Sequence, residues 1–186
     1  MAARCLPPVE FLQRCPDALA ERPSHYSELP IMFSMLGMLI IAHAPLASAL
    51  KSVAQHTFPD CAVTVETLDV SPHASVEQVE SDGRELLAQI SAREVLILTD
   101  VFGATPCNVA QRLAAECDGK VVKVVAGVNV PMLWRALCYS GSGLDTVVER
   151  AVAGAAQGVI QVSFSRPQNQ TSKLGSNDSN QHHHQQ

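Results

Sequence analysis

The stretch that decides the fold covers residues 95–106 and reads VLILTDVFGATP. Residues 95–99 are aliphatic or β-branched, which is typical of a short strand buried on both faces of a sheet. A carboxylate, Asp100, follows this strand directly. Thr105 and Pro106 then predict a helix start, because threonine is a favoured N-cap residue and proline is favoured in the first helical turn. The stretch thus predicts a strand, a loop and a helix in succession, the repeating unit of an α/β fold.

The same alternation recurs along the chain. Strands are expected over residues 38–42, 62–68, 95–99 and 121–126, and helices over about 45–56, 75–91, 106–117, 131–139 and 144–157. Such alternation implies right-handed crossovers and a doubly wound, mainly parallel sheet with four parallel strands.

A last run, residues 159–164, has the pattern of an edge strand. Val159, Gln161 and Ser163 alternate with Ile160, Val162 and Phe164. Strict alternation predicts that one face of this strand is buried. We expect it to join the border of the sheet or the sheet of a partner subunit.

Composition excludes several classes of function. The 186 residues are 47% hydrophobic and carry a net charge of −5, which argues for a globular core and against a nucleic-acid or polybasic membrane contact. The six cysteines show no CxxC pairing, and their scatter through apolar stretches predicts a reducing compartment, the cytoplasm.

One apolar run, residues 31–50, imitates a membrane span or a signal peptide. About thirty residues precede it, and it would have to bury His43 and absorb Pro45. We therefore interpret it as a buried strand followed by a turn and a helix, with no direct insertion into a membrane.

Both ends stand outside the alternating pattern. Residues 1–31 hold five prolines and no sustained period, and we expect an unstructured extension or a start codon assigned too early. Residues 166–186 form a polar tract rich in Gln, Asn and Ser, whose composition predicts disorder. The histidines at 182–184 have no fixed surroundings that would define a metal site. One domain, residues 38–165, remains.

Polar side chains follow the predicted strands where ligands bind in such sheets, beyond the carboxyl ends. They are His43, Asp100, the loop residues Gly103, Ala104 and Thr105, and Asn129. His43 has two interpretations: a hydrogen-bonded structural residue, or a nucleophile toward a phosphoryl group with one ring nitrogen held by Asp100. Residues 69–73, after the second strand, are typical of a turn.

The loop after Asp100 suits an anion. Gly103 and Ala104 keep side-chain bulk away, and a helix start at Thr105 presents unpaired N–H groups. An ordinary strand-to-helix turn would account for the same residues. The chain has no GxxxxGK[ST] or GxGxxG motif, so no nucleotide cofactor is expected, and neither a metal nor an organic cofactor is predicted.

Three blocks together resemble the IIA domain of the mannose/fructose/sorbose family of the phosphoenolpyruvate-dependent sugar phosphotransferase system. They are Ile40-Ile41-Ala42-His43-Ala44, the block Leu98-Thr99-Asp100-Val101-Phe102-Gly103-Ala104-Thr105-Pro106-Cys107-Asn108, and the block Ala126-Gly127-Val128-Asn129-Val130-Pro131-Met132-Leu133. The family commonly has glycine beside the histidine and a Gly-Gly pair in the second block, where this chain has alanines and Gly103-Ala104.

The resemblance implies a phosphotransferase that works through phosphohistidine. His43 would accept the phosphoryl group from phospho-HPr and pass it to a IIB component. Asp100 would orient His43, and Thr105 with the amides of residues 103–105 would hold the phosphoryl group. The family also implies a homodimer that exchanges its last strand. We expect a docking rim around His43 with Phe102, Met132 and Trp134 as candidates. Each of the three could equally be a core residue, and for Trp134 the core is the better explanation.

Two other functions remain open at this point. The protein could be a regulator whose phosphorylation state is sensed without transport, or the phosphotransferase subunit of dihydroxyacetone kinase, which also has a histidine at the end of its first strand. The sequence does not identify a sugar, because a phosphoryl carrier does not touch it.

Overall fold

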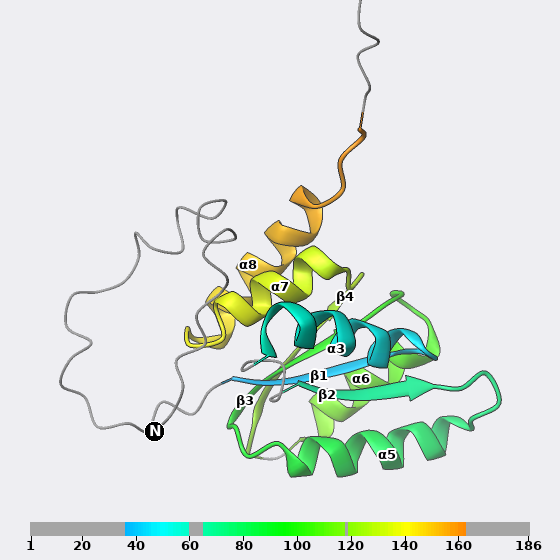
Figure 1. Cartoon of the computed structure of the whole chain (residues 1–186). Coiled ribbons are helices and arrows are strands. Elements are labelled where there is room, and N and C mark those ends of the chain that lie inside the picture. The colour runs from blue at the N-terminus through cyan, green and yellow to red at the C-terminus, as the bar shows by residue number, and fades with distance from the viewer. Residues whose placement is uncertain (1–35, 60–64, 118, 163–186) are drawn as a thin grey trace, which may run out of the picture.

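The structure, a computed structural model, describes residues 36–59, 65–117 and 119–162 (Figure 1). Within these ranges one sheet is formed by β1 (Gly37–His43), β2 (Val65–Val70), β3 (Glu94–Thr99) and β4 (Val121–Ala126). The helices in the same ranges are α3 (Leu46–Thr57), α5 (Val76–Gln89), α6 (Thr105–Glu116), α7 (Val130–Cys138) and α8 (Leu144–Gln157). The predicted strands 1 to 4 and all five predicted helices are confirmed, and residues 62–64 lie outside the described ranges.

The sheet is parallel throughout, in the order β2-β1-β3-β4. From β1 the chain passes through α3 to β2 on one side, and then through α5 to β3 on the other side of β1. The strand order therefore reverses between β1 and β3. This confirms the doubly wound α/β fold and places its switch point at the carboxyl ends of these two strands.

Helices cover both faces of the sheet (Figure 1). Met38, Ile40 and Ala42 of β1 pack in a cluster with α3, α7 and α8, whereas Leu39 and Ile41 pack in a second cluster with α5 and α6. A central strand buried on both sides needs apolar residues at every position, which explains the unbroken apolar run of β1. No helix within the described ranges is long and apolar enough to cross a membrane.

The helices begin and end where local chemistry favours it. The Ser75 side chain caps α5 by accepting a hydrogen bond from the N–H of Gln78, and Asn129 caps α7 in the same way.

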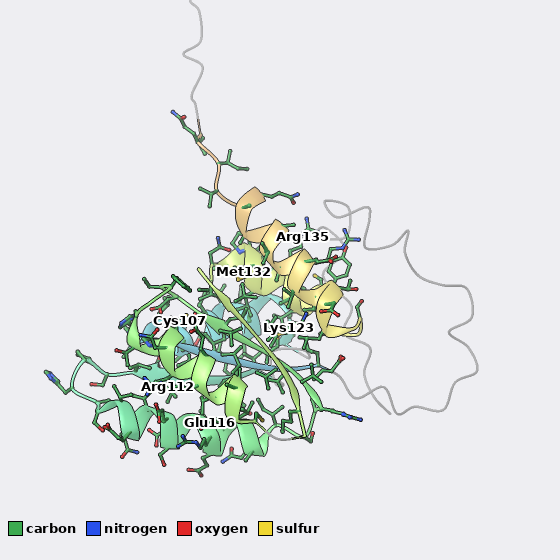
Figure 2. All side chains as sticks on the ribbon, turned by 180° about the vertical axis from the view of Figure 1, so that it is seen from behind. Cys107, Arg112, Glu116, Lys123, Met132 and Arg135 are labelled. Atoms are coloured by element: carbon green, nitrogen blue, oxygen red, sulfur yellow. The ribbon has the colours of Figure 1, made fainter. Side chains whose placement is uncertain are left out.

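Ion pairs connect α6 to α5. Figure 2 shows Arg112 and Glu116 on the part of α6 beside α5, where Arg112 pairs with Glu80 and Glu116 pairs with Arg84. Solvent screens these ion pairs, whose arginines are half-exposed, so apolar burial dominates the packing of the two helices.

The predicted last strand is not part of this chain's own sheet. Residues 159–162 form no strand, and Val159, Ile160 and Val162 are 78%, 74% and 70% exposed. The segment after α8 leads away from the sheet (Figure 1). The expectation that residues 159–164 join the border of this sheet is thus wrong for residues 159–162, because alternation predicts a buried face without saying which chain covers it. Addition to a partner's sheet stays a prediction.

The other predicted segments lie outside the described residues. These are positions 163 and 164 of the last strand, the extension over residues 1–31 and the tail over residues 166–186.

Candidate functional site

His43 and Asp100 meet at the switch point of the sheet. His43 ends β1 and Asp100 follows β3, and the parallel pairing that sets Ile41 opposite Thr99 brings the two residues together. Nδ1 of His43 lies 2.7 Å from Oδ2 of Asp100, and the backbone N–H of His43 donates to the same oxygen at 3.0 Å. The side chain of His43 is 51% exposed, whereas that of Asp100 is only 9% exposed.

The negative charge of Asp100 determines which ring nitrogen of His43 carries a proton. Burial alone would raise the pKa of Asp100, but hydrogen bonds from the backbone and ring of His43 and from the N–H of Val101 outweigh it, so its pKa lies below its usual range. An ionised carboxylate only accepts hydrogen bonds, so Nδ1 must carry the proton. In the neutral ring the lone pair is then on Nε2, and no hydrogen bond from the described residues engages this nitrogen.

The loop after Asp100 is shaped by glycine. Gly103 has a φ of +82°, a conformation that side chains with a Cβ adopt at a cost. A Cβ at this position would meet nothing within 4 Å, so the backbone conformation and not crowding favours glycine.

Helix α6 begins one residue earlier than expected. Its N-cap is Ala104, which contributes no side-chain cap, and Thr105 is already the first helical residue. The prediction that Thr105 is the N-cap is therefore wrong. Pro106 does lie in the first turn as predicted, where its missing N–H costs nothing.

Several N–H groups of this loop and turn have no partner. Within the described ranges, no acceptor is found for the backbone N–H groups of Phe102, Gly103, Thr105 and Cys107. We call these four groups the amide cradle. Unpaired N–H groups at a helix start favour an anion through both hydrogen bonding and the helix dipole. The cradle begins two residues after Asp100, at the same edge of the sheet as His43.

The third loop supports the site through its backbone. The N–H of Gly127 donates to the carbonyl oxygens of Thr99 and Asp100 at 2.9 and 3.0 Å. The side chain of Asn129 is occupied at both ends, because Oδ1 accepts from the N–H of Met132 and Nδ2 donates to the carbonyl of Ala155. Asn129 thus joins α7 to α8, and its amide is already used within the chain.

Only part of the predicted apolar rim is at the surface. Phe102 and Val101 are 79% and 54% exposed beside Asp100. Met132, labelled on α7 in Figure 2, is buried in the core, so of its two interpretations the core one is confirmed. The reason is that the apolar face of α7 turns toward the sheet. Trp134 packs edge-on against Phe58 at 6.3 Å between ring centroids, as the core interpretation of this residue predicts.

The residues after β2 hold the turn together. The N–H of His73 donates to Oγ of Ser71, and Oδ1 of Asp69, near the end of β2, accepts from the N–H of Ser48 at the start of α3.

Sequence reasoning assigned no role to Asn108, whose Nδ2 donates to the carbonyl of Gly103 at 3.1 Å. An asparagine in the first turn of a helix was a usable signal, because its side chain prefers bonds to nearby backbone. Within the described ranges, no group of three or more metal-ligating side chains gathers.

A half-exposed imidazole held by a buried carboxylate, next to unpaired helix N–H groups, is the arrangement of a nucleophile for an anionic group. A family model described as the PTS system fructose IIA component, EIIA-man, matches residues 37–152, more than half of the chain. The protein belongs to this family of IIA components of the sugar phosphotransferase system, which have a role in phosphoryl transfer.

Solved structures of such components share the fold. The chain is 26% identical to phosphotransferase system component EIIA from Streptococcus agalactiae, with a TM-score of 0.59, covering 68% of this chain and 97% of that one. It is also 26% identical to the PTS IIA protein associated with the fucose utilization operon from Streptococcus pneumoniae, with a TM-score of 0.57 and coverages of 68% and 93%. The mannose/sorbose specific IIA subunit from Enterococcus faecalis is 16% identical, with a TM-score of 0.57 and coverages of 71% and 98%.

Proposed function

We propose that the protein is a phosphohistidine carrier in which Nε2 of His43 accepts a phosphoryl group from phospho-HPr and passes it to a IIB component. The observation that carries the proposal is the 2.7 Å contact between Nδ1 of His43 and Asp100, which leaves Nε2 as the free nitrogen of a half-exposed ring. Free thiols at Cys107 and Cys117 fit action in the reducing cytoplasm.

The transfer step needs no added cofactor. The lone pair of Nε2 attacks the phosphorus atom of the donor's phosphohistidine, the P–N bond of the donor breaks, and its electron pair returns to the donor nitrogen. The ring of His43 gains positive charge as the new P–N bond forms, and the carboxylate of Asp100 stabilises that charge. The amide cradle and the hydroxyl of Thr105 would hold the phosphoryl oxygens. A nucleophile of the IIB component would then attack the same phosphorus atom, and the electron pair of the breaking P–N bond would return to Nε2 of His43.

Exposed apolar side chains beside His43 favour a transient protein partner. Phe102 and Val101 lie next to Asp100 and are largely exposed. A small apolar contact of this kind suits a donor or acceptor protein that must leave after each transfer. We propose that HPr and the IIB component bind over this patch in turn.

A homodimer is the second part of the proposal. Strand β4 is an edge of the sheet, and the apolar residues Val159, Ile160 and Val162 are exposed after α8. The outer edge of β4 presents backbone N–H and C=O groups that no neighbouring strand of the sheet binds. The exposed alternating segment of a second copy would pair with these groups. The last strand would then complete the sheet of the partner subunit.

Mass spectrometry of the intact protein tests the proposed carrier. After incubation with phosphoenolpyruvate, enzyme I and HPr, the wild-type protein is expected to gain one acid-labile phosphoryl group, and His43→Ala none. His73→Ala is the matched control, because His73 lies in a loop at the same end of the sheet, and it should be phosphorylated like the wild type. A phosphorylated His43→Ala variant would overturn the site, and an unmodified wild type would overturn the function.

A further inference from the structure

The side chain of Asn108 connects helix α6 to the loop that precedes it. Asn108 is exposed in the first turn of α6, and its Nδ2 donates to the carbonyl oxygen of Gly103 at 3.1 Å. Its backbone N–H donates to the carbonyl of Ala104, the regular bond of a helix start. One residue thus holds two successive carbonyls of the loop.

This contact gives the carbonyl of Gly103 a partner. Gly103 precedes the N-cap Ala104, so no N–H of the helix is its regular partner. The Asn108 side chain binds this carbonyl, and the N–H of Cys107, the third residue of the helix, has no acceptor within the described residues. Cys107 itself lies in the first turn of α6 (Figure 2), and its side chain is buried.

The loop is fixed from both ends as a result. Asp100 accepts the N–H of Val101 at 2.8 Å at the start of the loop, and Asn108 holds the carbonyl of Gly103 at its end. Gly103 between them has a left-handed conformation, and a Cβ at this position would meet nothing within 4 Å. Loss of the Asn108 side chain is therefore expected to loosen the loop at its helix end.

We propose that Asn108 is a positioning residue that holds the amide cradle in place for the phosphoryl group on His43. It acts through Gly103: by binding that carbonyl it fixes the loop conformation on which the orientation of the N–H groups of Gly103 and Thr105 depends. This inference rests on the proposed function and adds to it a residue that the carrier chemistry requires.

The kinetics of phosphoryl acceptance from phospho-HPr test this role. In Asn108→Ala the donor to Gly103 is lost, and in Asn108→Asp it is replaced by a nearly isosteric acceptor with a negative charge. We expect kcat to fall about 10- to 100-fold in both variants, because a small misplacement at a reacting centre costs that much. The KM for phospho-HPr should stay within about twofold, since the exposed patch around Phe102 is unchanged.

Gln111→Ala is the matched control. Gln111 is an exposed amide side chain one turn further along α6 that bonds to the Cys107 sulfur and not to the loop. This variant should keep wild-type kcat. The melting temperature of all three variants should stay close to that of the wild type, because a single exposed hydrogen bond contributes only about 1 kcal/mol.

The outcomes separate this role from the proposed function. Wild-type kcat in both Asn108 variants would overturn the positioning role and leave the carrier function intact. A fall in activity that matches a fall in folded protein would also overturn it, because Asn108 would then be a structural residue. A wild-type protein that accepts no phosphoryl group would overturn both proposals together.

Discussion

The chemistry of the site depends on which nitrogen of His43 is free. The contact of Nδ1 with a buried, ionised Asp100 holds the proton on that nitrogen and leaves Nε2 toward solvent. The sequence predicted that these two residues meet, because each follows a neighbouring strand of a parallel sheet. It did not predict that the backbone N–H of His43 would bind the same carboxylate, since such a contact depends on register and on side-chain geometry.

Asp100→Asn tests the orienting carboxylate. The amide keeps the size of the side chain but removes the charge that holds the proton on Nδ1. We expect the rate of phosphoryl acceptance to fall at least about 100-fold, in line with the loss of an orienting carboxylate in a catalytic triad. Mass spectrometry of the intact protein over a time course measures the rate, and an unchanged rate would remove the orienting role.

The lowered pKa of Asp100 also predicts how folding stability depends on pH. A carboxyl whose pKa is lower in the folded than in the unfolded state stabilises the fold above its unfolded pKa, and this contribution is lost as the pH falls through the folded pKa. Urea unfolding between pH 7 and pH 3 measures it. The wild type should lose its stability advantage over Asp100→Asn in the acidic range, and a constant difference would contradict the lowered pKa.

At the scale of single elements, the sequence was most informative where a segment contributes apolar residues to the core. The apolar runs of β1 and β3 predicted buried parallel strands, and Leu144–Gln157 was predicted with the bounds that α8 has. The start of α6 was wrong by one residue, because Thr105 is a good N-cap in general but Ala104 has the extended conformation here. Met132 was left open between the surface and the core, because a motif does not show which face of a helix is buried.

Gly37→Ala tests how tightly β1 packs at its start. A Cβ on Gly37 would overlap the side chain of Ile90 and lie 3.3 and 3.4 Å from those of Ala92 and Val95. We expect a loss of about 1–3 kcal/mol in the free energy of unfolding, as for other overpacked core positions. Gly141→Ala, where a Cβ would meet nothing within 4 Å, should change it by less than about 0.5 kcal/mol. Equal stabilities in urea unfolding would contradict this account of the packing.

At the scale of the whole molecule, alternation in the sequence predicted a strand over residues 159–164 but not its partner. The described part of this segment is exposed beyond α8, while β4 is an open edge of the sheet. The described residues of one chain leave both surfaces uncovered, and the proposed second copy would cover them. The alternating pattern predicts that one face of this segment is covered, but it does not show which surface covers that face.

The proposed dimer predicts a molar mass and a way to abolish it. Light scattering should give twice the 19.9 kDa of the chain for the wild type. The double variant Ile160→Glu, Val162→Glu places charges on the apolar face of the segment and should give the mass of one chain. Gln161→Glu, on the opposite face, should remain a dimer. A wild-type monomer, or a double variant that stays dimeric, would contradict strand exchange.

The most direct test of the central claim identifies the phosphorylated nitrogen of His43. The protein labelled with 15N-histidine is phosphorylated through enzyme I and HPr, and its ring nitrogens are observed by NMR under alkaline conditions that preserve phosphohistidine. The structure predicts one phosphoryl group on Nε2, with Nδ1 still protonated and bound to Asp100. A phosphoryl group on Nδ1, or on another histidine, would contradict the account of the site.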